Sequence, residues 1–222
     1  MGQKAATIRP APDTRALLLE AAGTCLRTYG YAGLSTRRVA EAAGAPLSQI
    51  HYHFGSKDAL VLALLDHQNQ RLIERQRTMF AANLPLWKRW DLACDYLDED
   101  VASGFVRILL EMIAAGWSNP DVAAAVRRSL AEWFRLLTLV SEEACTRLGP
   151  VENLQPADIG CLVGNLFVGS EALLLLGFHE EGLPIRRSLR RIGALIRTIE
   201  ESRTLGLEDA RKASRKGRVR QS

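Results

Sequence analysis

The chain has few of the features that mark exported, membrane-spanning or disulfide-stabilised proteins. Its 222 residues include only four cysteines, which are scattered and form no Cys-x-x-Cys pair. Thiols spaced in this way are typical of small buried residues in a reducing compartment, so we expect neither disulfides nor a thiol-ligated metal. No apolar run approaches the roughly 20 residues of a membrane-spanning helix. No apolar block follows Lys4 and Arg9, so no secretory signal is predicted and a cytoplasmic location is expected.

Catalytic motifs are also missing. The sequence contains no Gly-x-Ser-x-Gly, no glycine-rich phosphate loop and no His-Glu-x-x-His. Its densest carboxylates, at residues 98–100, are typical of an exposed helix face or turn. His51 and His53 are poor metal ligands, because residues two apart on a helix point in different directions. We therefore expect a protein that is not an enzyme and that binds no cofactor or metal.

Basic residues gather at both ends of an otherwise acidic chain. Residues 1–57 contain seven basic and three acidic side chains, and residues 206–222 contain six and two. Residues 58–205 contain sixteen basic and twenty acidic side chains. Local clusters of Lys and Arg neutralise phosphates, so this distribution favours a nucleic-acid partner. For the C-terminal tail, a merely solubilising role is the alternative, and it stays open.

Apolar residues recur at helical spacing along nearly the whole chain, and no segment alternates as a strand does. Caps and helix-ending glycines divide this pattern into nine helices, so the predicted fold is all-α. Asp13, Ser35, Pro46 and Ser56 begin the first four, of which the fourth is expected to run to about Asn83. The other five are expected at about 87–102, 105–117, 120–148, 156–179 and 184–204.

The segment Ser35–Lys57 has the pattern of a helix-turn-helix. Two short helices flank Gly44, which supplies the positive φ of the turn. Ala40 is small enough for the helices to cross closely, and Ile50 anchors the second helix from beneath. Histidine, amide, hydroxyl and phenol side chains then fall on the opposite face, and in such units the second helix lies in the DNA major groove. DNA binding is therefore favoured over a purely structural helix hairpin.

Residues 14–65 resemble the N-terminal domain of the TetR family of transcriptional repressors. The resemblance rests on Gly30-Tyr31, Leu34-Ser35-Thr36, Ala40-x-x-x-Gly44, His51-Tyr52-His53-Phe54 and Ser56-Lys57-Asp58-Ala59-Leu60. It implies a three-helix DNA-binding domain followed by a helical body that binds a ligand and forms a dimer. Trp117-Ser118-Asn119-Pro120-Asp121, between the sixth and seventh predicted helices, is also similar to the family.

The resemblance also implies which side chains meet DNA. Residues of the second helix contact phosphate or a base edge, the third helix reads bases, and a lysine that begins the fourth contacts phosphate. Carried over by position, these residues are Thr36, Arg37, Ser48, Gln49, His51, Tyr52, His53 and Lys57. The sequence departs from the family at His51, where tyrosine is usual, and at Leu47, where many members have a polar residue. These departures leave the operator sequence undetermined.

The predicted domain organisation follows the shifts in composition. Residues 1–12 are expected to be a flexible arm and residues 13–57 the helix-turn-helix domain. Residues 58–205 are expected to form the ligand-binding and dimerisation domain, and residues 206–222 a basic, disordered tail.

Two sites are expected in the helical body. Inward positions of the central helices predict a pocket for a lipophilic molecule, lined by Phe105, Glu111, Met112, Trp117, Phe134, Asn165, Phe167 and Glu171. Glycines of the eighth helix, which allow close approach, and the apolar stripe of the ninth fit the dimer interface that the family implies. The residues assigned to this interface are Gly160, Gly164, Leu189, Ile192 and Ile196.

These expectations describe a ligand-responsive repressor. Two-fold symmetry places two recognition helices about one DNA turn apart, so the operator is expected to be palindromic. A small lipophilic molecule is expected to release the dimer from DNA. The alternative is a helical protein-interaction scaffold that has lost specific DNA binding, and activation in place of repression also stays open.

Overall fold

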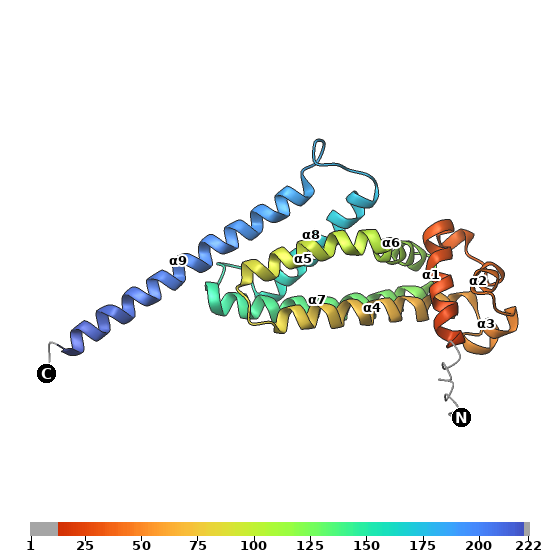
Figure 1. The fold of residues 1–222 in the computed structure, drawn as a ribbon, viewed down its shortest axis with the longest axis horizontal. Coiled ribbons are helices and arrows are strands. Elements are labelled where there is room, and N and C mark those ends of the chain that lie inside the picture. The colour runs from red at the N-terminus through yellow and green to blue at the C-terminus, as the bar shows by residue number, and fades with distance from the viewer. Residues whose placement is uncertain (1–12, 220–222) are drawn as a thin grey trace, which may run out of the picture.

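Nine α-helices and no strand make up the part of the chain that the computed structural model describes, residues 13–219 (Figure 1). Side chains are described up to Gly206, and the arm predicted at residues 1–12 lies outside the described residues. The helices are α1 (Thr14–Gly33), α2 (Thr36–Ala43), α3 (Leu47–His53), α4 (Lys57–Ala81), α5 (Leu86–Ser103), α6 (Phe105–Gly116), α7 (Pro120–Leu148), α8 (Pro156–Leu175) and α9 (Ile185–Val219). The all-α prediction is confirmed.

Local capping explains where the first four helices begin. Asp13, Ser35 and Ser56 each accept a hydrogen bond from a backbone N–H two or three residues downstream, as N-cap side chains do. Gly44 ends α2 in the left-handed conformation, with φ of 62°. Pro46 differs slightly from the prediction, because it occupies the N-cap of α3 rather than its first turn.

The last two helices differ from the prediction at their C-terminal ends. α8 ends at Leu175 because Gly177 has φ of 87° and the N–H of Phe178 bonds back to the carbonyl of Leu173 at 3.1 Å. α9 continues to Val219, through most of the segment that was expected to be a disordered tail. That segment contains no proline, and its Ala, Glu, Lys and Arg residues favour helix.

Two groups of buried apolar residues form the interior. The larger group joins α1–α4 to α6 and α7 and includes Leu26, Ile50, Leu64 and Met112. The smaller group joins α5, α8 and α9. The domain boundary predicted at residue 57 coincides with the start of α4, but the larger core crosses it. The helix-turn-helix is therefore packed rigidly onto the body.

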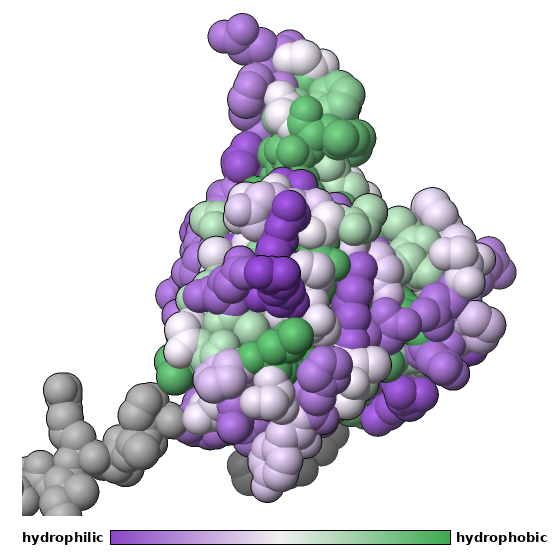
Figure 2. Space-filling model, turned by 90° about the vertical axis from the view of Figure 1, so that its right-hand side faces the viewer, coloured by the Kyte–Doolittle hydropathy of each residue, from purple (hydrophilic) through white to green (hydrophobic). Residues whose placement is uncertain are grey.

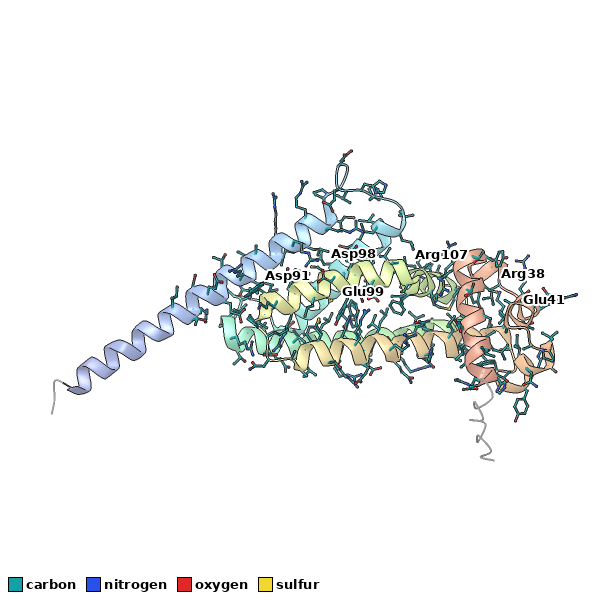
Figure 3. The ribbon with its side chains drawn as sticks, viewed as in Figure 1. Arg38, Glu41, Asp91, Asp98, Glu99 and Arg107 are labelled. Carbon is teal, nitrogen blue, oxygen red and sulfur yellow. The ribbon has the colours of Figure 1, made fainter. Side chains whose placement is uncertain are left out.

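The helices form an elongated bundle with α1 across one end and α2 and α3 beyond it (Figure 1). α9 lies against α5 and then extends away from the bundle at the opposite end. Ion pairs join these two helices, from Arg186 to Asp98 at 2.6 Å and from Arg190 to Asp91 at 3.4 Å. Figure 3 labels both aspartates on α5, where it passes α9.

α8 is apolar enough, and long enough, to cross a membrane by length and composition alone. It packs along α7, however, and its glycines explain how closely. A Cβ at Gly160 would lie 2.9 Å from the backbone nitrogen of Thr138, and one at Gly164 would overlap the ring of Phe134. The 18-residue apolar window of α8 is 22% buried, and its remaining residues are half-buried or exposed.

Candidate DNA-binding surface and ligand cavity

α3 presents a polar face to solvent at the end of the molecule. Ile50 has no exposed surface and fixes the helix onto the core, whereas Tyr52 is 81% exposed. Ser48 and His51 are also exposed, and Gln49 and His53 are half-buried. The Nδ1 atom of His51 lies 3.2 Å from the carbonyl oxygen of Gly55, which leaves the other ring nitrogen free to face outward. This arrangement is that of a helix able to enter a groove.

α2 adds basic side chains beside α3. Arg37 is highly exposed and pairs with Glu41 across 3.1 Å, an interaction that solvent weakens. Thr36 is the first residue of α2 and is half-buried. Arg38, which the sequence prediction did not include, donates to the carbonyl of Gly33 at 2.8 Å. Figure 3 shows Arg38 and Glu41 at this end of the molecule.

Lys57 is held in place at the start of α4. Its Nζ donates to the carbonyl oxygen of Tyr31 at 2.7 Å and lies 4.4 Å from the centre of the Tyr31 ring. An ammonium group has three N–H donors, so two remain for another acceptor. Lys57 therefore presents an oriented positive charge beside the α3 surface.

A hydrogen-bonded cluster joins this end to the helical body. Tyr31 donates its hydroxyl to Asp58 at 2.6 Å and its backbone N–H to Glu111 at 2.9 Å. Asn119, which caps α7, donates to the other oxygen of Asp58 at 3.2 Å. Burial and the hydrogen bond to Asp58 raise the pKa of Tyr31 to about 12, so its hydroxyl remains a donor. We call Tyr31, Asp58, Glu111 and Asn119 the latch.

The body contains a cavity of about 410 Å³. Its wall is mainly apolar and contains six aromatic residues: Phe80, Trp90, Tyr96, Phe105, Trp133 and Phe167. The two indole N–H groups are already bonded, from Trp90 to the carbonyl of Leu189 at 2.7 Å and from Trp133 to Gln76 at 2.8 Å. The aromatic faces are therefore held in fixed positions around the empty space.

Three charged residues line this cavity among the described part of the chain, namely Arg89, Asp100 and Glu171. Arg89 pairs with Glu143 at 2.7 Å, and Asp100 pairs with Arg75 of α4 at 2.6 Å. Burial, with a contribution from Asp100, raises the pKa of Glu171 to about 8, and Arg75 opposes this shift. A substantial fraction of Glu171 is therefore protonated at neutral pH.

The residues predicted for the pocket lie in different parts of the structure. Phe105, Phe167 and Glu171 line the cavity, but the other five residues do not. Met112 lies in the core beneath α1, and Trp117 is 84% exposed where α6 ends. The remaining three have other partners: Phe134 covers Gly164, Asn165 bonds to the carbonyl of Cys161, and Glu111 belongs to the latch. Helical periodicity identifies an inward face but not which neighbour that face meets.

Comparisons with known proteins show which family the end that carries α3 is similar to. Residues 18–64 match the family described as bacterial regulatory proteins, tetR family. The HTH-type transcriptional repressor AcnR of Corynebacterium efficiens is 39% identical over 62 residues, which cover 28% of this chain and 33% of AcnR. Residues 18–64 therefore match the DNA-binding domain of the TetR family. The match ends within α4, so it includes the α3 surface and excludes the cavity.

Two other comparisons extend further along the chain. The HTH-type transcriptional regulator CymR of Pseudomonas putida is 30% identical over 125 residues, covering 54% of this chain and 59% of CymR. This chain therefore spans less than two thirds of either curated relative. The structure of FadR from Bacillus subtilis in complex with stearoyl-CoA has a TM-score of 0.68 at 14% identity, covering 82% of this chain and 96% of FadR. This likeness shows that the two proteins share a fold.

Within the helical body, the residues predicted for the dimer interface face the interior. Gly160 and Gly164 pack against α7, and Leu189 is buried in the smaller core. Ile192 and Ile196 line the cavity. The close approach that the glycines allow is thus used inside the protomer. The exposed side of α8 carries Leu162, Leu166 and Gly169, and the two leucines also line the cavity.

Sequence reasoning also missed the contribution of α5 to the cavity. Arg89, Trp90, Tyr96 and Asp100 all lie on its inward face. They follow Leu86 at spacings of three, four, ten and fourteen residues, which place them on one helical stripe. Two charged residues on an otherwise apolar stripe were a usable signal, because buried charges need partners or a function.

Proposed function

We propose that this TetR-family protein is a transcriptional repressor that binds a palindromic operator as a homodimer and is released by a small lipophilic molecule. The observation that carries the proposal is α3, a seven-residue helix with Ile50 fully buried and with Ser48, His51 and Tyr52 exposed. Ser48, Gln49, His51, Tyr52 and His53 supply donors, acceptors and apolar edges suited to base pairs in a major groove. AcnR is described as a repressor, which favours repression over activation.

A homodimer is supported by apolar surface that one protomer leaves uncovered. Leu162 is 59% exposed on α8, and Leu195 on α9 is 60% exposed. More exposed apolar side chains gather where α8 passes to α9, at the top of Figure 2, including Leu176 and Phe178. An exposed apolar surface of this kind is typical of an interaction site. We assign the dimer interface to this outward face rather than to the inward residues predicted from the sequence.

Release by a ligand requires a connection between the cavity and α3. α4 lines the cavity with Leu72 and Met79 and begins at Lys57 beside the DNA-binding surface. α6 lines it with Phe105 and holds Tyr31 through Glu111. A ligand that binds more tightly when these helices are shifted lowers the affinity for DNA. DNA lowers the affinity for that ligand by the same factor. FadR, which shares this fold, was solved with stearoyl-CoA, which supports a ligand with a long apolar part.

Binding of the purified protein to fragmented genomic DNA, followed by sequencing of the retained fragments, tests the DNA-binding half of the proposal. We expect a few fragments with a shared palindrome to be enriched. Arg37→Ala is expected to weaken binding to that palindrome by about 1–3 kcal/mol if the guanidinium reads a base. Lys57→Ala is expected to weaken all sequences alike and to reduce the salt dependence by about one counterion per half-site.

Arg128→Ala is the matched control, because Arg128 is exposed on α7, outside the proposed surface. It is expected to leave both affinity and salt dependence unchanged. If the protein enriches DNA fragments no better than an unrelated basic protein does, the repressor proposal is wrong. The alternative, a helical protein-interaction scaffold, would then remain. If Arg37→Ala and Arg128→Ala reduced the affinity for DNA equally, the proposed contact between α2 and DNA would be wrong.

A further inference from the structure

Of the three described charged residues that line the cavity, two are paired with an opposite charge and one is not. Arg89 is only 5% exposed and is paired with Glu143, while Asp100 is paired with Arg75. Glu171 is 9% exposed, and its carboxyl group has no hydrogen-bond partner among the described residues. Burying a carboxyl group without a partner is costly, so such a group points to a partner that is absent. Glu171 is the unmatched charge of the wall.

Among the described residues, the cation whose charge acts on Glu171 is Arg75, and its guanidinium is bound elsewhere. The guanidinium of Arg75 already binds Asp100 at 2.6 Å, binds Glu99 at 3.4 Å and lies 4.2 Å from the centre of the Tyr96 ring. Among the described residues, the Nε–H groups of Arg75 and Arg89 have no acceptor, and both atoms are enclosed. Arg89 also lines the cavity, but it is 5% exposed and already paired with Glu143, so Glu171 is the lining charge without a partner.

The aromatic residues of the cavity wall also favour a cation. Phe167 lies one helical turn before Glu171 on α8 and packs edge-on against Trp90, with 5.6 Å between ring centres. Tyr96, Phe105 and further aromatic rings complete the wall. The faces of aromatic rings attract cations, most strongly where water is excluded. An unpaired carboxyl beside such rings is suited to a positively charged group attached to an apolar body.

We propose that the cavity selects a lipophilic cation, an amine or quaternary ammonium compound, whose charge pairs with Glu171 while its apolar part contacts the aromatic wall. This inference rests on the ligand-responsive function proposed above and specifies the chemistry of its ligand. A lipophilic anion would place its charge beside Glu171 and Asp100, where like charges repel. A neutral lipophile would leave Glu171 without a partner.

Three probes of equal chain length separate these possibilities: decyltrimethylammonium, decanol and decanoate, each used below its micelle concentration. Trp90 and Trp133 line the cavity, so quenching of tryptophan fluorescence reports binding to the full-length protein. The wild-type protein is expected to bind the cation at least about tenfold more tightly than decanoate. Glu171→Gln is expected to reduce cation affinity by about tenfold or more and to leave decanol affinity unchanged.

Two further variants show whether a loss of cation affinity comes from the missing charge or from misfolding. Glu142→Gln changes an exposed glutamate of α7 and is expected to bind all three probes as the wild type does. Glu171→Asp keeps the charge and is expected to retain part of the preference for the cation. Urea unfolding of each variant establishes that it is folded. Decanol or decanoate binding as tightly as the cation, or an unchanged cation affinity in Glu171→Gln, would overturn the proposal.

The pH dependence of binding supplies an independent readout. Because burial raises the pKa of Glu171 to about 8, pairing with a permanent cation requires loss of the carboxyl proton. The charged groups around it are Asp100 and Arg89 of α5, which pair with Arg75 of α4 and Glu143 of α7, while α6 and α9 contribute uncharged residues to the wall. Affinity for decyltrimethylammonium is expected to rise about tenfold from pH 6.5 to 8.5. The same rise in Glu171→Gln would contradict the proposal.

DNA retention measured on the same preparations separates this inference from the proposed function. If decanoate or decanol binds and releases DNA, the repressor proposal holds and the cation proposal fails. If the cation binds through Glu171 but no DNA fragment is enriched, the cation proposal holds and the repressor proposal fails.

Discussion

At one end of this molecule, α1–α3 fill their interior with apolar side chains and turn their polar groups outward. At the other end, α4–α9 enclose a cavity and bury charged residues in its wall. Leu26 and Ile50 at the first end have no exposed surface, and the cap side chains of α1 and α2, Asp13 and Ser35, are both bonded. Glu171 at the second end has no bonded partner. The contrast is the one expected from the proposed function, with a filled end that docks on DNA and a hollow end that a ligand completes.

The largest predicted effect comes from comparing two Leu→Ala substitutions, one at each end of the molecule. Leu26→Ala removes side-chain atoms from the filled core and is expected to lower the free energy of unfolding by about 3–4 kcal/mol. Leu137→Ala enlarges an existing cavity, so fewer contacts are lost and about 1–2 kcal/mol is expected. Urea unfolding monitored by circular dichroism measures both. Equal losses would contradict the idea that the two ends are packed differently.

The second prediction concerns the buried carboxyl group. The pKa of Glu171 is about 8 in the folded protein, above the value of about 4.3 for an unfolded chain. Between these values the unfolded state binds fewer protons, so the wild type loses stability as pH rises. Glu171→Gln removes this dependence and is expected to gain about 2 kcal/mol relative to the wild type from pH 5.5 to 7.5.

Glu142→Gln is the control for this pH series, because its carboxyl group is exposed. Urea unfolding at each pH is the measurement. A constant difference between wild type and Glu171→Gln across the range would show that Glu171 is not buried as described.

The third prediction concerns the connection between the two ends. Glu111→Gln weakens the charge-assisted hydrogen bond to the Tyr31 N–H but leaves the cavity wall intact. We expect ligand and DNA to bind separately as in the wild type, while the coupling between them falls by about 1 kcal/mol. DNA titrations with and without ligand measure the coupling. Arg128→Ala, away from the latch, is expected to preserve it.

Local signals were enough to predict how the DNA-facing end is built. Asp13, Ser35 and Gly44 act through their own backbone neighbours, so their positions in the sequence determine their role. The exposed face of α3 follows from Ile50, the single buried residue of that helix. These features depend on contacts only a few residues apart.

The cavity could not be predicted in the same way, because six helices contribute to it. Glu111 and Phe105 lie on the same short helix, yet one binds Tyr31 and the other lines the cavity. α6 touches α1 as well as α7, and helical periodicity does not distinguish these neighbours. Gly160 was likewise recognised as a point of close approach, but the approaching backbone is Thr138 of the same chain.

The most direct test of the central claim is a dimethyl sulfate footprint on an enriched DNA fragment, since this reagent methylates guanine N7 in the major groove. The account predicts two protected patches about 10 base pairs apart, centre to centre, or a multiple of this spacing. Protection should be lost when Gln49 and Tyr52 are both replaced by alanine and retained in Arg128→Ala. Protection that is spread along the fragment, or that survives the double substitution, would contradict the assignment of α3 as the element that reads DNA.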